Sequence, residues 1–375
     1  KEQVSVSLST SKPKGQLYVY EIPDKDIARE LSTAVVLPSP YFLLSSEDRT
    51  EYINGIKSKS IFTNFYKYFR AKFQILMNRD KPQGGQWSFD KDNQQVPSDK
   101  QITTAIYTQQ SSNWDKWLEK SKKAPVVYGT EATVPYATSR QAAYKTLKNF
   151  IKSRLINFGA YQDFYDINNW QTNHSVISML LNVGLLTPAL VIKQVCRVPG
   201  IPLNSLEGFI RQLFWREYMY VIYCRNIQIE NYFHNKKQMP LSVWEAKTGI
   251  LPVDHAINQV KQTGYLHHIG RLMILGSYFL MYEIHPNKVF EWFNCMFVDA
   301  YDWVMIGNVY CMSQFSDGGQ HTTRPYFSSS KYLTKMSNFP SGDWTVRWDQ
   351  LFHQFLSRKK AKLKKLYFVS RWLKG

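Results

Sequence analysis

The chain has 375 residues, of which 44% are hydrophobic and 20% are charged, and its formal net charge is +18 at pH 7. This balance excludes an intrinsically disordered chain, and the length is sufficient for two domains. The large excess of positive charge is not needed for folding and predicts a polyanionic partner. Nucleic acid is the first candidate and an anionic membrane the second. The basic run from Arg358 to Leu366 is either part of such a surface or an ordinary solvated helix face.

The cysteines lack the close paired spacing of zinc and iron–sulfur sites and are typical of free thiols in a reducing, intracellular compartment. They are Cys196, Cys224, Cys295 and Cys311. No apolar run approaches the ~18 residues of a membrane span, and we expect no signal peptide. Because the first residue is Lys rather than Met, we expect a fragment or a processed product.

Residues 1–45 predict the end of an α/β domain. Gln16–Ile22 and Thr33–Leu37 are typical of short strands, and the segment Asp24–Glu30 between them is compatible with a helix. Two strands are too few to bury both faces of a sheet. We therefore expect a remnant of an α/β domain whose beginning is missing.

Residues 46–133 predict a helical segment followed by an interdomain linker. Ser45–Lys57 opens with a helix-start pattern, and aromatic residues between Phe62 and Leu76 recur at the spacing of an amphipathic helix. Arg79–Asn93 is rich in turn residues, and Gln94–Thr133 is polar and poorly periodic.

Residues 134–375 predict an all-helical domain, so the fold class is mainly α. No internal repeat interrupts the series, and no strand-rich region follows residue 40. The predicted helices are Ala142–Phe158, Ser175–Leu186, one beginning at Pro188, Leu206–Tyr223, Pro252–Lys261, Leu266–Tyr282, Pro286–Phe297 and Ala300–Met305.

Two polar groups in this domain allow two interpretations each. One group shares a predicted helix face and is either capping with an exposed face or a ligand site; it consists of His174, Ser175, Ser178 and Asn182. In the other, Glu207 and Arg211 lie one helical turn apart in an apolar helix that also carries Trp215. They form either a surface ion pair or one wall of an interior cleft.

The densest polar cluster lies in the oily stretch from Gly264 to Tyr332. Such groups are costly to bury without partners and therefore indicate a ligand. The cluster consists of His267, His268, Arg271, Asp302 and Asn308. His268 and Arg271 share a helix face, Asp302 is able to pair with Arg271, and no metalloprotease-type spacing of histidines is present.

Residues at the end of this stretch and two tryptophans complete the candidates. Arg324 and Lys331 suit contacts with phosphates, and Tyr326 is placed to stack. Trp244 and Trp292 are core tryptophans if nothing else is known of them.

Taken together, these pieces resemble the photolyase–cryptochrome family, specifically its branch of bacterial (6-4) photolyases that carry an iron–sulfur cluster. The resemblance extends over nearly the whole chain from about residue 37. It rests on SPYFL (39–43), NRDKPQGGQWSFDKDN (78–93), FGAYQD (158–163), HSVIS (174–178), LNVGLL (181–186), EGFIRQLFWREY (207–218), HHIGRLM (267–273), VDAYDW (298–303), MSQFSDGG (312–319) and RPYFSSSKY (324–332).

The resemblance implies an N-terminal antenna domain and a helical domain that holds a U-shaped FAD. It implies a flavin cradle made of His174, Ser175, Ser178, Asn182, Glu207, Arg211, Trp215, His268, Arg271, Asp302 and Asn308. In this cradle Arg271 and Asp302 would form an ion pair beside the flavin ring, with Asn308 near a ring nitrogen.

The same resemblance implies the remaining roles. His267 and His268 would line the lesion pocket with Tyr326 beside them. Trp292 and then Trp244 would be the stations that carry an electron inward, and Arg324 and Lys331 would meet DNA.

Two departures from the family pattern matter. The branch is expected to hold its cluster through cysteines near Pro252 and in Asn338–Gln350, where this chain has none, so we expect no iron–sulfur cluster and no other metal. The family's opening strands, which help to bind the antenna, are also absent, which leaves the antenna chromophore open.

The resulting hypothesis is light-driven repair of UV-induced pyrimidine dimers, above all (6-4) photoproducts, by electron transfer from reduced FAD. The expected enzyme is a DNA photolyase, a lyase that acts as a monomer on UV-damaged DNA within the cell and not at a membrane. The alternatives are a cryptochrome-like photoreceptor without repair activity and a decayed, truncated homologue.

Overall fold

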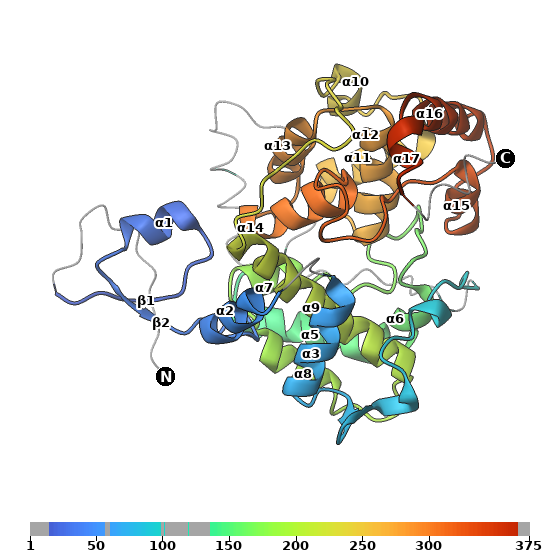
Figure 1. Ribbon diagram of the computed structural model, residues 1–375. Helices are drawn as coiled ribbons and strands as arrows, with labels where there is room; N and C mark the ends of the chain where they lie inside the picture. The colour runs from blue at the N-terminus through green and yellow to red at the C-terminus, as the bar shows by residue number, and fades with distance from the viewer. Residues whose placement is uncertain (1–14, 57–60, 99–100, 102–118, 120–135, 367–375) are drawn as a thin grey trace.

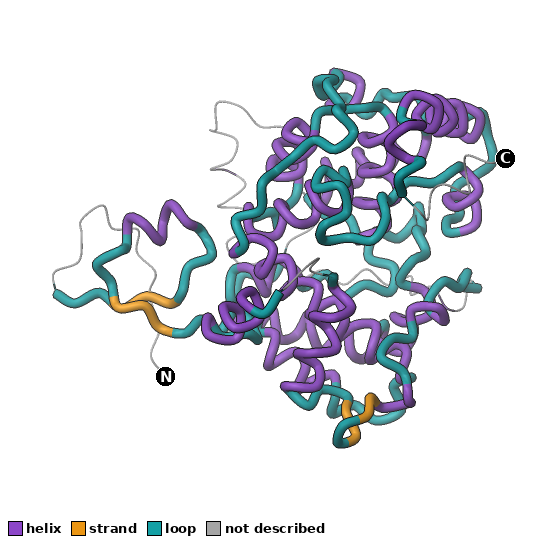
Figure 2. Tube along the Cα trace, in the orientation of Figure 1, coloured by secondary structure: helices purple, strands orange, loops and turns teal. Residues whose placement is uncertain are grey.

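The computed structural model describes residues 15–56, 61–98, 101, 119 and 136–366. Most of the segment predicted as a linker lies outside these residues. Within them, strands occur in two small sheets and the remainder is helix and loop (Figure 2). No helix in the described part of the chain is both long and apolar enough to span a membrane.

The N-terminal unit is a βαβ element beside the helical body (Figure 1). Strand β1 (Tyr18–Tyr20) pairs in parallel with β2 (Val35–Leu37), and helix α1 (Lys25–Glu30) connects them. Asp24 caps α1 because its side chain accepts from two backbone N–H groups of the first turn. The two predicted strands and the helix between them are therefore confirmed.

A short hairpin and two 3-10 turns lie in the loop that the turn residues predicted. They are β3 (Met77–Asn78), β4 (Lys81–Pro82), η1 (Gln83–Gly85) and η2 (Asp90–Asp92). Both adjacent glycines of this loop have positive φ angles, which L residues rarely adopt.

Helices form the rest of the described chain. The α-helices are α2 (Ser46–Asn54), α3 (Phe62–Lys72), α5 (Arg140–Ser153), α6 (Leu155–Tyr161), α7 (Ser178–Asn182), α8 (Pro188–Val195), α9 (Leu203–Cys224), α10 (Leu241–Trp244), α11 (Leu251–Thr263), α12 (Ser277–Met281), α13 (Pro286–Met296), α14 (Asp302–Met305), α15 (Ser330–Lys335), α16 (Trp344–Arg358) and α17 (Lys360–Leu363). Two π-helical segments, η4 (Gly270–Gly276) and η5 (Ile306–Ser313), continue directly into or from α-helices.

Three predicted helices differ from those observed. The predicted helix Ala142–Phe158 is two helices, because the chain turns out of helical geometry at Arg154. The predicted helix Ser175–Leu186 begins only at Ser178, since Val176 has a φ of +54°. The predicted helix Leu266–Tyr282 begins at His268 and contains η4.

Helix α9 organises the body. It is apolar on most of its faces, which is typical of a helix buried on all sides. Helix α6 packs against its first turns so closely that the Cα atom of Gly159 leaves no room for a side chain: a Cβ there would lie 2.5 Å from the backbone N of Ser205. Glycine is required at this crossing.

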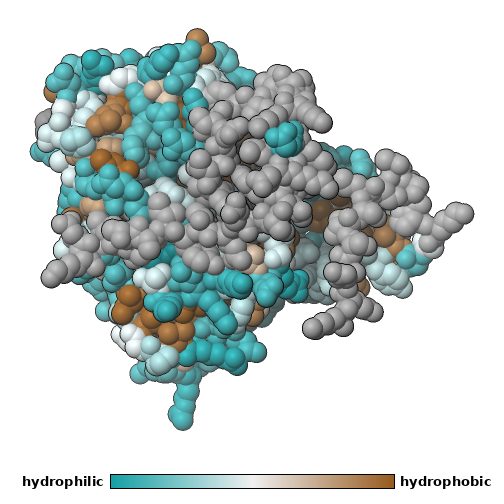
Figure 3. All heavy atoms as spheres, turned by 180° about the vertical axis from the view of Figure 1, so that it is seen from behind, coloured by the Kyte–Doolittle hydropathy of each residue, from teal (hydrophilic) through white to brown (hydrophobic). Residues whose placement is uncertain are grey.

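Two large hydrophobic clusters divide the body. One includes residues of α3, α5, α6, α8 and α9, and the other includes residues of α11, α12, α13 and α16. Their helices occupy the lower and upper halves of Figure 1. Seen from behind, the described surface is mostly hydrophilic with scattered hydrophobic patches (Figure 3).

The N-terminal unit is attached to the second half of α9. The hydroxyl of Tyr220 donates to Glu21 at 3.2 Å, and Arg49 pairs with the same carboxylate. In the segment that follows this unit and leads to α2, the backbone N–H of Leu44 donates to the buried carboxylate of Glu217 at 3.2 Å. Residues that are far apart in the sequence therefore fix this unit.

Candidate functional site

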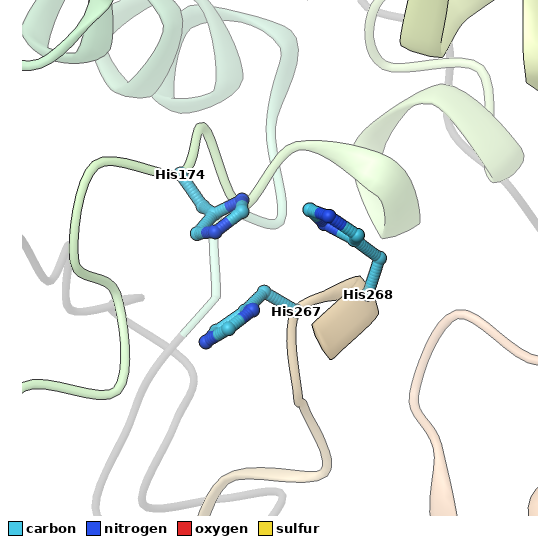
Figure 4. A group of neighbouring side chains, drawn as sticks. All are labelled: His174, His267 and His268. Atoms are coloured by element: carbon cyan, nitrogen blue, oxygen red, sulfur yellow. The ribbon is translucent and has the colours of Figure 1, made fainter. Parts of the chain in front are cut away.

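Three histidines meet where the two halves of the body join. The rings of His174 and His267 stack with centroids 4.3 Å apart and an interplanar angle of 11°, and His268 lies edge-on to both (Figure 4). His174 and His267 are buried, whereas the His268 side chain is 37% exposed. His268 Nε2 donates to Asp163 Oδ1 at 2.9 Å, which orients the ring.

The buried histidines have unsatisfied nitrogens. Among the described residues, neither Nδ1 nor Nε2 of His267 has a hydrogen-bond partner, and Nε2 of His174 has none either. An unsatisfied buried polar atom costs about 1–3 kcal/mol. A native site retains such atoms when a ligand or water satisfies them.

Burial holds both of these histidines in the neutral form. It lowers the pKa of His174 and of His267 well below the usual value of 6.5. Neighbouring imidazoles lower both pKa values further, with a smaller effect of Arg154 on His174 and of Arg271 on His267. A neutral imidazole offers one donor and one acceptor. The histidine stack therefore presents both kinds of group to a planar polar ligand.

The same histidines are poorly arranged for a metal ion. One nitrogen of each lies within 4.8 Å of the others. Ligand lone pairs lie in the plane of the imidazole ring, so two parallel stacked rings direct them side by side and not toward a common point. The ring geometry therefore favours an organic ligand.

Asp299 is the centre of the adjacent polar network. Its carboxylate accepts from Arg271 Nη1 at 2.9 Å and Nη2 at 3.0 Å, and from Ser178 Oγ at 2.6 Å. The amide of Asn182 donates to the Asp299 carbonyl at 2.9 Å. Three predicted cradle residues thus converge on one acid that the prediction did not include.

The predicted ion pair between Arg271 and Asp302 is wrong. Asp302 is exposed in the first turn of α14, where a helix N-terminus favours an acid, and its carboxylate lies 3.4 Å from the Asn294 amide. Asp299 lies in the turn that precedes that helix, is itself buried, and takes the pairing instead.

The predicted cradle residues on α9 have protein partners. Glu207 accepts from the Tyr66 hydroxyl at 2.9 Å and from Arg211 Nε at 3.1 Å, and Arg211 also pairs with Asp90 at 2.8 Å. Trp215 stacks on Phe62 with centroids 3.6 Å apart. These contacts attach α3 and the η2 turn to α9, so a flavin role for the three α9 residues stays a prediction.

The other predicted cradle residues lie on both sides of this region. Ser175 is half-buried in the loop before α7. Asn308 lies in η5, and its amide donates to the Val304 carbonyl at 2.8 Å. The two π-helical segments touch, because a Cβ on Gly276 would lie 2.4 Å from Ser313 Oγ. π-Helical turns are rare and often occur at functional sites.

Tyr326 lies close to Asp163, the residue that pairs with His268. Burial raises the pKa of Tyr326, and the carboxylates of Asp90 and Asp163 raise it further against the opposing charge of Arg324. The Arg324 guanidinium lies 5.9 Å from the Tyr326 ring centroid. Arg324 and Lys331 are both exposed, as residues that contact a polyanion must be.

The two predicted electron carriers are neighbours. The centroids of Trp244 and Trp292 lie 6.4 Å apart. Trp292 is fully buried, and its ring lies 6.1 Å from Phe297, whose face contacts Arg271 at 4.1 Å. Trp244 is half-buried, so an electron that enters from the surface would pass Trp244 before Trp292, which is the reverse of the predicted order.

Comparisons with known proteins assign the fold and the family. Residues 9–128 match the family model described as deoxyribodipyrimidine photo-lyase-related protein, and residues 209–355 match the FAD binding domain of DNA photolyase. A protein of Agrobacterium fabrum named (6-4) photolyase is 34% identical over 342 residues, which cover 86% of this chain and 67% of that protein. The chain belongs to the photolyase–cryptochrome family.

A solved structure and a viral protein are also similar to this chain. The solved structure of a bacterial class III photolyase from Agrobacterium tumefaciens covers 89% of this chain and 68% of its own, with a TM-score of 0.53 and 16% identity, and shows a common fold. An uncharacterized protein of Acanthamoeba polyphaga mimivirus is 45% identical over 104 residues, which are 27% of this chain and 84% of that protein. The photolyase domain and the relatives named as photolyases make this chain a photolyase-type lyase with an FAD-binding domain.

The described residues fit a flavin. The unsatisfied nitrogens of the histidine stack and the paired charges of Arg271 and Asp299 suit a planar ring with mixed donors and acceptors. Two residues at this site, Asp163 and Asp299, were missed from the sequence. Asp299 could have been found from the sequence. Asp302 lies at the start of a helix, where an acid is favourable without any ligand, so Asp299 was the better candidate for the partner of Arg271.

Proposed function

We propose that this protein binds UV-damaged DNA and repairs pyrimidine dimers, in particular (6-4) photoproducts, in light. The observation that carries the proposal is the histidine stack, which combines a half-exposed His268 with two buried histidines whose nitrogens lack partners among the described residues. The relative named (6-4) photolyase supports the choice of lesion.

Ser178, Asn182, Arg271, Asp299 and Asn308 would hold the FAD. When bound, reduced FAD supplies the electron that light releases to the lesion. The bidentate Arg271–Asp299 pair fixes the orientation of the Arg271 fork, and the Ser178 hydroxyl holds the same carboxylate from another helix. The protein thus contributes orientation and a fixed electrostatic environment.

His268 is the proposed acid. Its Nε2 is held by Asp163, so we assign the transferable proton to Nδ1. His174 and His267 stay neutral and would accept or donate hydrogen bonds without carrying charge. Tyr326 would stack beside a base that has been flipped out of the duplex, and Arg324 and Lys331 would contact phosphates.

The test is the His268→Ala variant, with exposed His353→Ala as the matched control. We expect H268A to bind FAD normally but to lose light-dependent repair of a (6-4) oligonucleotide, while H353A keeps both. General acid catalysis of this kind contributes about 10²–10⁴-fold. Repair by H268A at the wild-type rate would contradict the assignment.

The same assay separates the runner-up. A cryptochrome-like photoreceptor would take up FAD and undergo light-driven reduction, yet would repair neither (6-4) nor cyclobutane lesions. Wild-type protein with that behaviour would overturn the repair proposal and leave the flavin site intact.

A further inference from the structure

A second buried cluster of ligand-type side chains lies outside the histidine stack. Cys311 comes from η5, and Asp317 and His321 come from the loop that follows it. The three residues are 0%, 4% and 2% exposed. His321 Nδ1 lies 2.8 Å from Asp317 Oδ2 and 3.9 Å from Cys311 Sγ.

The hydrogen bonds define the form of His321. Nη1 of Arg225 lies 2.8 Å from His321 Nε2, and a guanidinium is only a donor. Nε2 is therefore unprotonated, and the proton on Nδ1 points to Asp317. Asp317 also accepts from the backbone N–H groups of Gly319 and His321, at 3.0 and 3.1 Å, so its position is fixed independently of the imidazole.

We propose that Cys311, Asp317 and His321 bind a zinc ion, which replaces the proton on Nδ1 of His321. Thiolate, carboxylate and imidazole are the three side-chain ligands of zinc, and all three donor atoms here lie within 4.8 Å of one another. Tetrahedral zinc separates an oxygen and a nitrogen ligand by about 3.3 Å, and a sulfur and a nitrogen ligand by about 3.6 Å. The distances of 2.8 and 3.9 Å lie below and above these values, so a shift of about 0.5 Å of the imidazole away from Asp317 and toward Cys311 brings both pairs close to the tetrahedral separations.

Binding requires a specific proton balance. The Cys311 thiol releases one proton and becomes a thiolate. The His321 proton moves from Nδ1 to Nε2, so that Nδ1 is free to bind the metal. Nε2–H then faces the donor Arg225, which must turn away; this is feasible because Arg225 is only half-buried. Arg225 therefore competes with zinc for the tautomer of His321.

The ion would have a structural consequence. It would join the end of η5 to the Gly318–Gly319 loop, which already contacts α9 because the Tyr218 hydroxyl donates to the His321 carbonyl at 3.3 Å. Three protein ligands leave the fourth position of zinc to water. The site does not depend on the proposed flavin or DNA chemistry.

The experiment measures zinc in the purified protein, without light or DNA. After treatment with a chelator, dialysis against zinc and removal of the excess, we expect one zinc ion per chain in the wild type by mass spectrometry of the metal. C311S should lose it. Cobalt in place of zinc should give a thiolate-to-cobalt charge-transfer band in the difference spectrum of the wild type that C311S lacks.

Arg225→Gln removes no ligand and serves as the second variant. The glutamine oxygen can accept from Nε2–H, and partners of this kind change metal affinity by about 10–100-fold, so R225Q should bind zinc at least about tenfold more tightly in competition with a chelator. Zinc content in the wild type no higher than in C311S, or equal affinity in the wild type and R225Q, would overturn the proposal.

Discussion

Replacing Asp299 by Asn tests the centre of the proposed flavin site. The Asp299 side chain is 7% exposed and that of Arg271 is 19% exposed, and the carboxylate accepts three side-chain hydrogen bonds. Removing one partner of a buried ion pair costs about 3–5 kcal/mol. Asparagine retains one acceptor oxygen and Arg271 reaches some solvent, so we expect a loss near the lower limit, about 3 kcal/mol.

The matched control is Asp302→Asn, three residues further along the chain. Asp302 is exposed and lies 3.4 Å from one amide, so D302N should change the free energy of unfolding by less than about 0.5 kcal/mol. Urea unfolding at pH 7, followed by far-UV circular dichroism, measures both variants, and flavin absorbance measures the FAD that each retains. We expect D299N to lose FAD and D302N to keep it. Equal effects of the two variants would refute the pairing.

Three further substitutions test other parts of the structure. Burial raises the pKa of the Glu217 carboxyl to about 7. This effect of burial is larger than the opposing effect of the positive charge on the neighbouring Arg216, which lowers the pKa. Because this pKa is higher in the folded than in the unfolded state, the protein loses stability as the pH rises from about 4.5 through about 7. E217Q should therefore be more stable than wild type at pH 8 by about 2–3 kcal/mol, and the difference should vanish as the pH falls from 7 toward 4.5. A stability difference between the two proteins that stays constant with pH in thermal unfolding would contradict this. Trp292→Phe should slow light-driven FAD reduction by at least about tenfold. Trp303 is a buried tryptophan in another hydrophobic cluster, so Trp303→Phe should leave the rate unchanged. Equal rates of the two variants in absorbance traces would exclude the relay. Gly159→Ala should cost about 3 kcal/mol in urea unfolding because its Cβ meets backbone, and Gly55→Ala, with only ordinary contacts, should stay within about 0.5 kcal/mol; similar losses would argue against the close α6–α9 crossing.

Helices and strands were predictable where hydrophobic spacing determines them. The βαβ unit and α9 follow from apolar periodicity and capping residues. The π-helical segments were not predictable, because α- and π-helices share nearly the same hydrophobic pattern and differ only in which backbone groups pair. The late start of α7 depends on the positive φ of Val176, which tertiary packing imposes and no sequence pattern announces.

The candidate site was predictable in composition but less so in pairing. The histidines, Arg271 and Ser178 were all expected, and the structure brings them into one region. The turn between α13 and α14 decides which carboxylate accepts hydrogen bonds from Arg271. Within three residues of this turn, Asp299 is buried and Asp302 is exposed. Spacing along a helix carries no information about that turn.

The attachment of the N-terminal unit to α9 has a consequence for synthesis on the ribosome. Leu44 and Glu217 are separated by 173 positions, and Lys25 reaches the Tyr223 carbonyl across 198. At about 5–20 residues per second, the early segment waits for roughly 10–40 seconds until its binding surface has been made. During that time Phe42 and the aromatic face of α3 lack their native partners on α9, which include Tyr220 and Trp215. Chaperones that bind nascent apolar segments would therefore act on this part of the chain.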